Sequence, residues 1–493
     1  EYRYYNYLYS QLQSTKYFTG QLLCFIEQAM ALCYNLNMKF RVFLAITGCK
    51  LARFLLRALG KGATTLPGKI AIKICPDILG YLAKDVKCIV VTGTNGKTTT
   101  SRMIEQTLMD MKVNYFANKS GANLIFGMIT EFAANSGLSG KPKKEYALIE
   151  SDEAAFRTAG KYLDPKCILV TNVFRDQLDR YGEITHTLNN IKEGIQKSKN
   201  AVVCLNADCS LTASLHEEID NRVVFYGVNT PIYKEQVKEA SDAPYCIHCK
   251  NEYDYDYHTY GHLGKYRCSK CGYRRPEPSI FVSNILMQDT DSSKICVNIN
   301  GHERIANINL PGGYNIYNAV SAIAVCDTMG FDEDVSIDAL STFECGFGRM
   351  EKFVLDDTHV RMILIKNPAG CNQVLNFMSN LEEDSIFVIM LSDNYADGTD
   401  ISWIWDVDFE SLLNIQNHLS DIFVGGIRAD DMSVRLKYAG INTDKIKVIK
   451  DYDRLLQAFT GQDKPVFIMP TYTAMMELRA MVSKKYGYKN FWE

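Results

Sequence analysis

Between residues 86 and 329, short apolar runs alternate with longer stretches that have the spacing of helices. The runs have the length of buried strands. They occupy residues 88–91, 146–150, 167–171, 201–205 and 222–226. Strands and helices that alternate in this way form a mostly parallel sheet covered by helices. The pattern therefore predicts a central α/β domain, to which we assign residues 86–340.

The same alternation begins again near residue 345 and continues to the end of the chain. The candidate strands are residues 362–366, 386–391, 421–425, 445–449 and 466–469. No long flexible linker, internal repeat or low-complexity tract is visible. We therefore expect a second, Rossmann-like α/β domain over residues 345–493.

The first 85 residues follow a different pattern. Residues 1–37 are crowded with Tyr and Gln and show no clear period, whereas Met38 opens a stretch typical of a protein start. We expect residues 1–37 to be a non-native or disordered extension. Residues 38–85 are predicted as a basic, amphipathic helical segment, with a helix at residues 50–60 that Gly60 ends. This helix either packs on the next domain or lies on an anionic membrane.

Residues 39–49 imitate a lipoprotein signal, because basic residues precede a short apolar region and a Cys. The apolar core is only about six residues long, which is below the usual length of an export signal. Most of the sixteen cysteines stand singly within apolar runs, as in proteins of a reducing cytosol. We therefore expect a cytoplasmic protein that can lie peripherally at the inner face of the cell membrane.

Composition excludes several classes of protein. The 493 residues are 47% hydrophobic and 23% charged, as in an average globular protein, and no run is long enough to span a bilayer. The formal net charge is −3 and the pI is about 6.3. The chain as a whole thus lacks the basic surface of a nucleic-acid-binding protein, and we expect no nucleic-acid partner.

A phosphate-binding turn follows the first predicted strand. Residues 93–99 read Gly-Thr-Asn-Gly-Lys-Thr-Thr and lead into a helix-like segment. The turn can aim backbone N–H groups and a helix N-terminus at an anion, Lys97 can reach the terminal phosphates, and Thr98 can hold Mg²⁺. The longer consensus has a glycine where this chain has Val91. We expect ATP as the ligand, bound by Thr94, Asn95, Gly96, Lys97, Thr98 and Thr99.

Two predicted strand ends near this turn are acidic. Residues 146–153 end in a cluster of acids, and residues 171–182 contain further aspartates. Carboxylate oxygens suit a hard cation, and the phosphates of a nucleotide need charge compensation. Both strand ends are therefore candidates for holding Mg²⁺.

Residues 242–275 interrupt the central domain with paired cysteines. Eighteen residues separate two Cys-x-x-Cys pairs, namely Cys246 with Cys249 and Cys268 with Cys271. Two such pairs close a tetrahedron around Zn²⁺, and the hairpin between them would hardly fold without it. We expect one structural Zn²⁺, whose loss destabilises the insertion and at first spares the ATP chemistry. Three nearby histidines are surplus to this set and are interpreted as surface residues: His248, His258 and His262.

The turn at residues 93–99, a Glu at the next strand end and the TNxxxDxxDRYG sequence at residues 171–182 together resemble the Mur ligase family. Residues 315–319 resemble the NxxNA segment of this family, and residues 348–351 resemble its GRxE turn. The resemblance implies a Mur-ligase-like P-loop domain. It also implies site residues: Thr98 and Glu150 for Mg²⁺, Asn318 for adenine, and Arg349 for the γ-phosphate region.

One position departs from the family. Mur ligases usually have a His after the Asp of the second motif, as a ligand of a second Mg²⁺, and this chain has Gln177. Gln offers only an amide oxygen, which is a weaker ligand. We also find no counterpart of the carbamylated lysine that many members use, so we assign no second Mg²⁺.

Features of the predicted C-terminal domain make the resemblance more specific than the Mur ligase family as a whole. Residues 393–406 follow an apolar strand, are rich in Asp and hold two of the three Trp, so that a functional loop is expected, with a Ca²⁺ site or a solvated turn as alternatives. With residues 366–370 and the zinc-ribbon insertion, this loop resembles the MurT family over about residues 40–480. In that family a GatD-type class I glutaminase is the partner that releases ammonia. The resemblance implies that Asp400 completes the partner's Cys-His pair; a simple turn former, or a cap for a helix that begins near Ser402, is the simpler role.

These features together predict an ATP-dependent amide ligase subunit, with Lys97, Arg349 and Asp400 in catalytic roles. The resemblance implies that it activates the α-carboxylate of D-isoglutamate in the lipid II stem peptide, met at the membrane surface, and that ammonia then gives D-isoglutamine. Three alternatives stay open. They are a Mur-type or folylpolyglutamate-type ligase that adds an amino acid, a zinc-ribbon nucleic-acid ATPase, and a non-catalytic ATP-binding scaffold.

Overall fold

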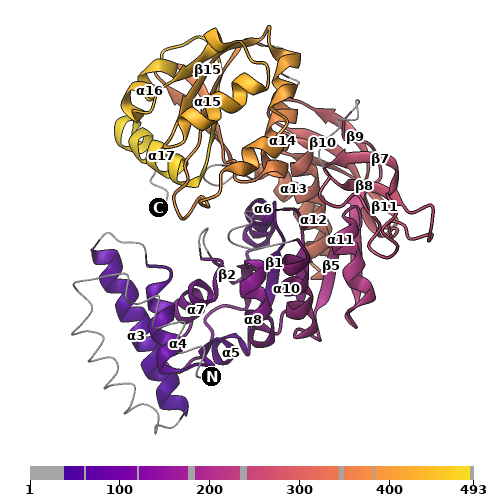
Figure 1. Ribbon diagram of the computed structural model, residues 1–493. Coiled ribbons are helices and arrows are strands. Elements are labelled where there is room, and N and C mark those ends of the chain that lie inside the picture. The colour runs from indigo at the N-terminus through magenta and orange to yellow at the C-terminus, as the bar shows by residue number, and fades with distance from the viewer. Residues whose placement is uncertain are drawn as a thin grey trace. The chain divides into compact units, whose positions relative to one another are not determined.

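The computed structural model describes residues 38–59, 63–118, 122–175, 184–233, 241–343, 349–379, 381 and 383–488 (Figure 1). Residues 1–37, Gly60 and Gln177, about which the sequence made predictions, lie outside these described residues. The chain divides into two compact units. One consists of Glu1–Lys87 and Asn118–Glu145, and the other of Cys88–Ala117 and Tyr146–Glu493.

The first unit contains four described helices: α3 (Met38–Ala58), α4 (Leu66–Ile74), α5 (Ile78–Ala83) and α7 (Ile125–Ala134). Helix α3 packs along α4 (Figure 1) and buries small apolar residues such as Ala45 and Cys49. Helices α4 and α7 approach closely at Gly68, where a Cβ would lie 1.9 Å from the carbonyl oxygen of Phe126. The helix predicted at residues 50–60 is therefore the second half of one 21-residue helix.

The two sides of α3 differ in character. Arg53 is mostly buried and pairs with Glu131 of α7 at 3.0 Å, so this basic residue packs within the unit. A row of large apolar side chains on α3 and just after it is exposed: Phe40, Phe43, Leu51, Phe54, Leu55 and Leu59. Among the described residues, no helix is both long enough and apolar enough to cross a bilayer.

The second unit begins with a nine-stranded sheet among the described residues, in the order β11-β10-β9-β6-β5-β4-β1-β3-β2. The strands are β1 (Lys87–Thr92), β2 (Tyr115–Ala117), β3 (Tyr146–Glu150), β4 (Cys167–Val170), β5 (Val202–Asn206), β6 (Val223–Val228), β9 (Ile280–Gln288), β10 (Ser293–Ile299) and β11 (His302–Ile308). Pairing is parallel from β1 through β4, β5 and β6 to β9. All five strands predicted for this domain lie in that parallel part or beside it.

Helices pack on this sheet in two groups. The first group is α6 (Lys97–Asp110), α12 (Gly313–Thr328) and α13 (Glu333–Thr342), and the second is α8 (Glu153–Leu163) and α10 (Ile184–Gln196). Helix α12 is buried along almost its whole length and contacts β4, β5, β6 and β9. Because α6 and α12 pack together, the residues at their N-terminal ends are brought into one region.

The antiparallel edge of the sheet was not predicted. Strands β9, β10 and β11 form a meander, in which β10 alternates strictly between buried and partly exposed residues. The turn between β10 and β11 is Asn300-Gly301, and both residues have positive φ. This Asn-Gly turn between alternating runs is the sequence signal for a hairpin.

The cysteine-rich insertion contains a two-stranded antiparallel hairpin, β7 (Asp254–Tyr260) with β8 (Leu263–Arg267), as the sequence predicted. Between β5 and the insertion lie the short α11 (Ser210–Ser214) and the 3₁₀ turn η1 (Leu215–Glu217). A small core of Cys246, Tyr253, Tyr266 and Cys268 holds the insertion together.

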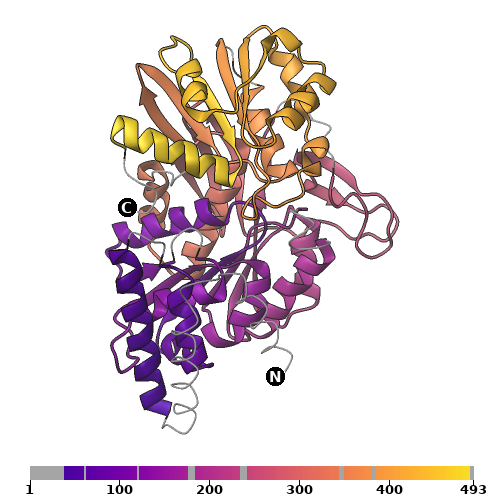
Figure 2. The same cartoon turned by 60° about the vertical axis from the view of Figure 1, so that its left-hand side comes forward.

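The C-terminal domain is coloured orange to yellow in Figure 2. It has a six-stranded sheet among the described residues, in the order β12-β13-β17-β14-β15-β16. Its elements are β12 (Arg349–Leu355), β13 (Thr358–Ile363), α14 (Pro368–Met378), β14 (Ser385–Met390), η2 (Ser402–Asp406), η3 (Phe409–Ile415), β15 (Leu419–Gly425), α15 (Ala429–Tyr438), η4 (Thr443–Lys445), β16 (Ile446–Val448), α16 (Tyr452–Phe459), β17 (Val466–Pro470) and α17 (Tyr472–Tyr486). Only β12 pairs antiparallel, with β13. The predicted α/β fold class is confirmed.

One predicted strand is shifted. The sequence favoured residues 362–366, whereas β13 ends at Ile363 and the chain then leaves the sheet. Asn367 caps α14 by accepting a 2.8 Å hydrogen bond from the N–H of Gly370, and Pro368 fixes the first helical turn. The apolar residues after Ile363 therefore belong to a connection rather than to a strand.

Candidate functional site

The turn between β1 and α6 can be made only with glycine at two positions. Gly93 and Gly96 have φ values of 116° and 85°, in the region that other residues rarely adopt. A Cβ on Gly96 would lie 2.2 Å from Oδ1 of Asn318, and a Cβ on Gly93 would lie 2.4 Å from Oγ1 of Thr171. The turn is thus enclosed by α12 on one side and by the chain after β4 on another.

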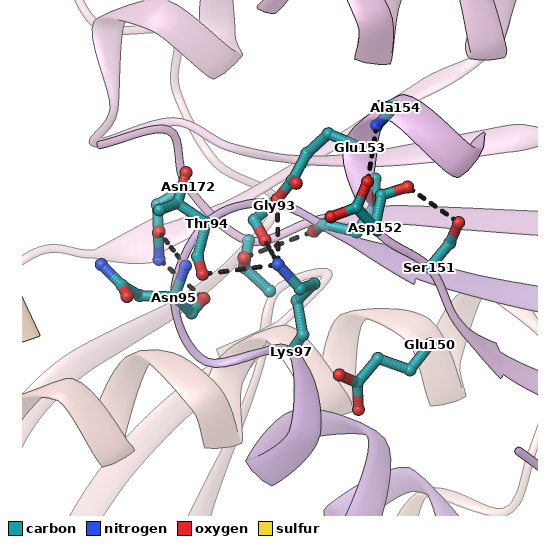
Figure 3. A network of polar contacts seen from close by, with 12 residues as sticks. Gly93, Thr94, Asn95, Lys97, Glu150, Ser151, Asp152, Glu153, Ala154 and Asn172 are labelled. Carbon is teal, nitrogen blue, oxygen red and sulfur yellow. Dashed lines mark hydrogen bonds and ion pairs between the residues drawn. The ribbon is translucent and has the colours of Figure 1, made fainter. Parts of the chain in front are cut away.

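Lys97, the first residue of α6, points toward Glu153 at the start of α8 (Figure 3). Its Nζ lies 2.9 Å from Glu153 Oε1, and it also donates to the carbonyl oxygen of Gly93. Both side chains are largely buried. Although burial alone disfavours the charge, the carboxylate of Glu153 raises the pKa of Lys97 above its ordinary value. Lys97 is therefore a charged ammonium group that Glu153 and the carbonyl oxygen of Gly93 hold in place.

Thr98 and Glu150, the pair expected to bind Mg²⁺, are in direct contact. The hydroxyl of Thr98 donates to Glu150 Oε1 at 3.1 Å, and Glu150 ends β3 beside the turn. A hydroxyl and a carboxylate oxygen are suitable ligands for Mg²⁺. The two residues fit such a site in chemistry and in position.

Asn95 is held from two directions. Its backbone N–H donates to Asn172 Oδ1 at 3.0 Å, and the side-chain amide of Asn172 donates back to its carbonyl oxygen at 3.2 Å (Figure 3). From the C-terminal domain, Asn367 donates to Asn95 Oδ1 at 3.0 Å. The second motif and the C-terminal domain thus both fix the phosphate-binding turn. Residues 176–183 of that motif, including Gln177, lie outside the described residues.

A pocket lies next to this turn. It is bounded by the turn and the N-terminal part of α12 from the central domain, and by the β13–α14 connection from the C-terminal domain. Its lining is Asn95, Gly96, Thr99, Asn172, Tyr260, Tyr314, Asn315, Asn318, Ile363, Leu364, Lys366, Ala369, Gly370, Gln373 and Val374. A pocket with amide and apolar walls suits a nucleoside.

Asn318, the residue expected to read adenine, lies in this pocket. Its side-chain amide donates to Asn315 Oδ1 at 3.0 Å, and its Oδ1 accepts from the hydroxyl of Thr100 at 3.3 Å. These bonds fix the orientation of the amide against Gly96. Arg349 is the first residue of β12, and its side chain lies outside the described part of the structure.

The four predicted zinc ligands lie together, with all four Sγ atoms within 4.8 Å of one another. The Sγ atoms of Cys246 and Cys271 are 3.5 Å apart, and those of Cys249 and Cys268 are 3.4 Å apart. Zinc–sulfur bonds of about 2.3 Å in a tetrahedron place the sulfurs roughly 3.8 Å apart, so the donor set fits Zn²⁺. The N–H of Cys271 and other backbone groups lower the pKa of the Cys268 thiol to about 7, which favours the thiolate that a metal needs.

The prediction that His262 is a surface residue is wrong. The side chain is fully buried, its Nε2 lies 3.3 Å from the Sγ of Cys209, and its ring lies 4.4 Å from that of Phe174. Burial raises the pKa of Cys209, but the neighbouring His262 outweighs this effect and lowers it to about 7. The sequence could not show this contact, because the hairpin tip that carries His262 folds into the central domain. His248 is exposed and His258 is partly exposed.

Asp400 lies in the loop between β14 and η2. Its Oδ1 accepts a 2.8 Å hydrogen bond from the N–H of Ser402, two residues later, so it forms an Asx turn just before η2, whose N-cap position is Ile401. Nearby, Asp397 is buried and accepts a 2.7 Å bond from the N–H of Thr473, and burial raises its pKa. Of the two simpler roles predicted for Asp400, the structure shows the turn former and not the cap. The turn uses one carboxylate oxygen of a partly buried residue and leaves a role toward a partner open.

Sequence reasoning assigned no role to several residues that shape the site. Glu153 was noticed only as part of an acidic run, although its spacing from the strand end places it at the start of a helix. Asn172 and Asn367 stand in quoted motifs without an assigned contact. Tyr260 carried no signal, because its place in the pocket depends on how the insertion folds.

Comparisons with known proteins agree with this geometry. Family models of the Mur ligase middle domain and the MurT ligase C-terminal domain match residues 91–326 and 364–475. Subunit MurT of lipid II isoglutaminyl synthase (glutamine-hydrolyzing) from Streptococcus pneumoniae (strain R6) is 34% identical, over 91% of this chain and 98% of that protein. The same subunit from Staphylococcus aureus (strain COL) is also 34% identical, over 90% of this chain and 99% of that protein.

Among solved structures, a pseudomurein peptide ligase type C from Methanothermus fervidus superposes with a TM-score of 0.62 at 22% identity. The match covers 83% of this chain and 81% of that one, and it supports the fold. The sequence matches extend over nearly the full length of both MurT relatives and over both domains. This chain therefore belongs to the MurT family within the Mur ligases.

Proposed function

We propose that the chain is the synthetase subunit of a lipid II isoglutaminyl synthase. The observation that carries the proposal is the likeness to the MurT subunits, which spans 91% of this chain and includes both the P-loop domain and the C-terminal domain. A likeness confined to the P-loop domain would support only a general ligase. The C-terminal match therefore favours an amidating enzyme over a ligase that adds an amino acid.

In the proposed reaction, the γ-phosphate of ATP is transferred to the α-carboxylate of D-isoglutamate in the lipid II stem peptide. Ammonia then attacks the activated carbonyl carbon and displaces phosphate, which leaves D-isoglutamine. The turn from Thr94 to Thr99 and Lys97 hold the phosphates, and Asn318 lies at the nucleoside pocket. Arg349 is assigned the role of stabilising the negative charge on the phosphate group that is transferred.

Thr98 and Glu150 would hold Mg²⁺, which compensates the charge of the phosphates when it is bound. Glu153 keeps Lys97 in place through their 2.9 Å ion pair. Asn95, Asn172 and Asn367 hold the turn rigid between the two domains. Such fixed donors lose little energy to reorganisation when charge develops on the reacting groups.

The ammonia is proposed to come from a separate glutaminase subunit of the GatD type. Of the cysteines that the structure describes, Cys209 has a histidine partner, but both residues are fully buried and out of reach of glutamine. Near Asp400, large apolar side chains are exposed, including Tyr395 and the contacting pair Trp405 and Tyr438. This surface is suited to a protein partner.

A contact with the inner membrane surface is proposed for α3. Its exposed row of Phe and Leu side chains gives an apolar face, and Arg57 adds an exposed positive charge. Such a face can lie in the interface of an anionic bilayer. A membrane position would bring the enzyme to a lipid-linked substrate.

Phosphate release from ATP tests the enzymatic part of this proposal. Release should depend on both lipid II and ammonia, since the carboxylate is the phosphate acceptor and ammonia completes the turnover. ATP binding without substrate-dependent release would leave only a nucleotide-binding scaffold. Release that requires an amino acid instead of ammonia would identify the amino-acid-adding alternative.

A further inference from the structure

The tip of the β7–β8 hairpin lies inside the central domain, although the hairpin belongs to the four-cysteine insertion at residues 242–275. Tyr260, His262 and Leu263 are buried, and Leu263 forms an antiparallel bridge with Cys209 after β5. Gly261, at the turn, has a φ of 54°, and a Cβ there would lie 2.7 Å from the ring of Phe174. The tip is therefore fitted tightly against the residues that follow β4.

Two rings connect this tip to the phosphate-binding turn. Tyr260 lines the nucleoside pocket and stacks on Phe174, with the ring centroids 5.7 Å apart and the rings nearly parallel. The N–H of Phe174 donates to Oγ1 of Thr94 at 3.2 Å, and the same hydroxyl lies 3.3 Å from the carbonyl oxygen of Phe174. The insertion thus supplies one wall of the pocket and supports the turn through one intermediate residue.

A second connection runs to α12. The hydroxyls of Thr259 and Tyr317 are 2.7 Å apart, and Tyr317 also donates to Asp208 Oδ2 at 2.5 Å. Tyr317 lies between Asn315 and Asn318 in the sequence, and both asparagines line the pocket. The hairpin therefore fixes the helix turn that faces the nucleoside.

A buried ion pair joins the C-terminal end of the insertion to Asp208, the residue that Tyr317 also contacts. Arg275, four residues after Cys271, donates through Nε to Asp208, and the two side chains are 2% and 0% exposed. Arg275 also donates to Asn229 Oδ1 at 2.9 Å. Breaking a buried pair of this kind strongly destabilises a protein, because one charge is left uncompensated. Asp208 therefore contacts both Tyr317 of α12 and Arg275 at the end of the insertion.

We propose that the four-cysteine insertion is a positioning element of the nucleotide pocket, so that metal binding by its four cysteines and nucleotide binding are energetically coupled. The hairpin depends on the metal for its fold, and the pocket depends on the hairpin tip for a wall and for the orientation of α12. Coupling of this kind is reciprocal, so that each ligand strengthens the binding of the other by the same factor. The proposal rests on the nucleotide site under the proposed function, and it departs from the expectation that loss of metal spares the ATP chemistry.

The first test measures ADP affinity by calorimetry, in excess Mg²⁺, for the full-length protein loaded with zinc and for the same protein treated with a zinc-selective chelator. We expect the dissociation constant for ADP to rise by about tenfold or more when zinc is removed, in the usual range of coupling. In the reverse experiment, ADP should slow the transfer of zinc to a chromogenic chelator. Equal ADP affinity with and without zinc would overturn the proposal.

Two variants separate coupling from general unfolding. Tyr317→Phe and Thr259→Val each remove one hydroxyl of the 2.7 Å contact and keep the shape of the side chain. With zinc content unchanged, both should weaken ADP binding by about fivefold and reduce the effect of ADP on zinc release. The matched control is Tyr245→Phe, which removes an exposed hydroxyl from the same insertion and should change neither quantity.

The outcomes are distinguishable from a failure of the proposed function. If both variants bind ADP and release zinc as the wild type does, the coupling is overturned and the proposed function is not affected. No ADP binding by the zinc-loaded wild-type protein would overturn the coupling and also the nucleotide site on which the proposed function depends.

Discussion

Lys97 has two kinds of negative partner, the carboxylate of Glu153 that it contacts and the phosphates that the turn is suited to bind. The ion pair is largely buried, so neither group can be removed without consequence for the other. This arrangement fixes the ammonium group beside the turn. It also means that the loss of Lys97 affects stability as well as chemistry.

Replacement of Lys97 by Ala should lower the rate of ATP-dependent amidation by at least about a hundredfold, because a preorganised charge on the phosphates is lost. The same change leaves the Glu153 carboxylate buried without its cation and should cost about 3 kcal/mol of unfolding free energy. Initial rates of phosphate release and denaturant unfolding measure the two effects.

The double variant Lys97→Ala/Glu153→Gln provides the control. It removes the uncompensated charge, so most of the lost stability should return while activity stays absent. An active double variant would mean that Lys97 has no role in the chemistry. A double variant as unstable as the single one would contradict the stabilising role of the ion pair.

Replacement of Asp400 by Asn should nearly abolish glutamine-driven amidation by the complex with the glutaminase and keep substantial amidation with high ammonium. Asn forms this kind of turn as Asp does, so the contact with the N–H of Ser402 is retained and only the charge is lost. A carboxylate that orients the partner's histidine cannot be replaced by an amide in this way. Parallel assays with glutamine and with ammonium salt give the two rates.

The matched control is Asp393→Asn in the same loop, where the carboxylate makes a long contact of 3.6 Å with Arg428. This change should leave both rates near the wild-type values. Glutamine-driven activity that survives in Asp400→Asn would restrict Asp400 to the simple role of a turn former.

The residues that the sequence placed correctly are those whose roles follow from local geometry. Thr98 and Glu150 meet because a strand end and a helix start are neighbours in a parallel α/β unit, and the cysteine pairs meet because their spacing closes a tetrahedron. His262 was misplaced because its burial depends on the packing of one inserted hairpin against another part of the chain. No local pattern reports such a contact.

At the scale of elements, the parallel strands were predictable because they are buried on both faces and appear as continuous apolar runs. The antiparallel edge from β9 to β11 gives an alternating pattern, which apolar runs alone do not reveal. Helix α7 lies within the sequence range assigned to the central domain but packs with α3 and α4. Its ten residues are mostly apolar, with Thr130 and Glu131 as the polar exceptions, and this pattern does not indicate which helices they contact.

Helix α3 allows a specific prediction about membranes. The double variant Phe54→Ser/Leu55→Ser should bind vesicles of anionic lipid clearly more weakly than the wild type, since two exposed apolar side chains are lost. Arg57→Ala should weaken binding by about 1 kcal/mol, which is the usual value for one basic residue near the surface. Sedimentation with vesicles measures both changes.

Arg53 serves as the internal control for this helix. Arg53 and Arg57 both lie on α3, but Arg53 is paired with Glu131 and mostly buried, whereas Arg57 is exposed. Arg53→Ala should therefore lower the thermal stability and leave vesicle binding almost unchanged. Equal vesicle binding by the wild type and the Phe54/Leu55 variant would restrict α3 to a packing role.

At the scale of the whole molecule, the nucleotide site combines the phosphate turn of one domain with the β13–α14 connection of the next. Asn95 and Asn367 join the two directly, and the cavity has walls from both. The proposed synthetase chemistry needs this composite site. In the proposed reaction the ammonia comes from another subunit, and the C-terminal domain has a partly apolar surface around Trp405 that suits such a partner.

Mass spectrometry of lipid II tests the central claim most directly. Lipid II is incubated with the chain, ATP, Mg²⁺ and ammonium salt, and in parallel with glutamine and the glutaminase partner. The account predicts the mass change for one carboxyl group converted to an amide, located at the D-isoglutamate residue, with ammonium alone sufficient and with Lys97→Ala inactive. Lipid II that stays unchanged in both mixtures, or that gains an amino acid, would contradict it.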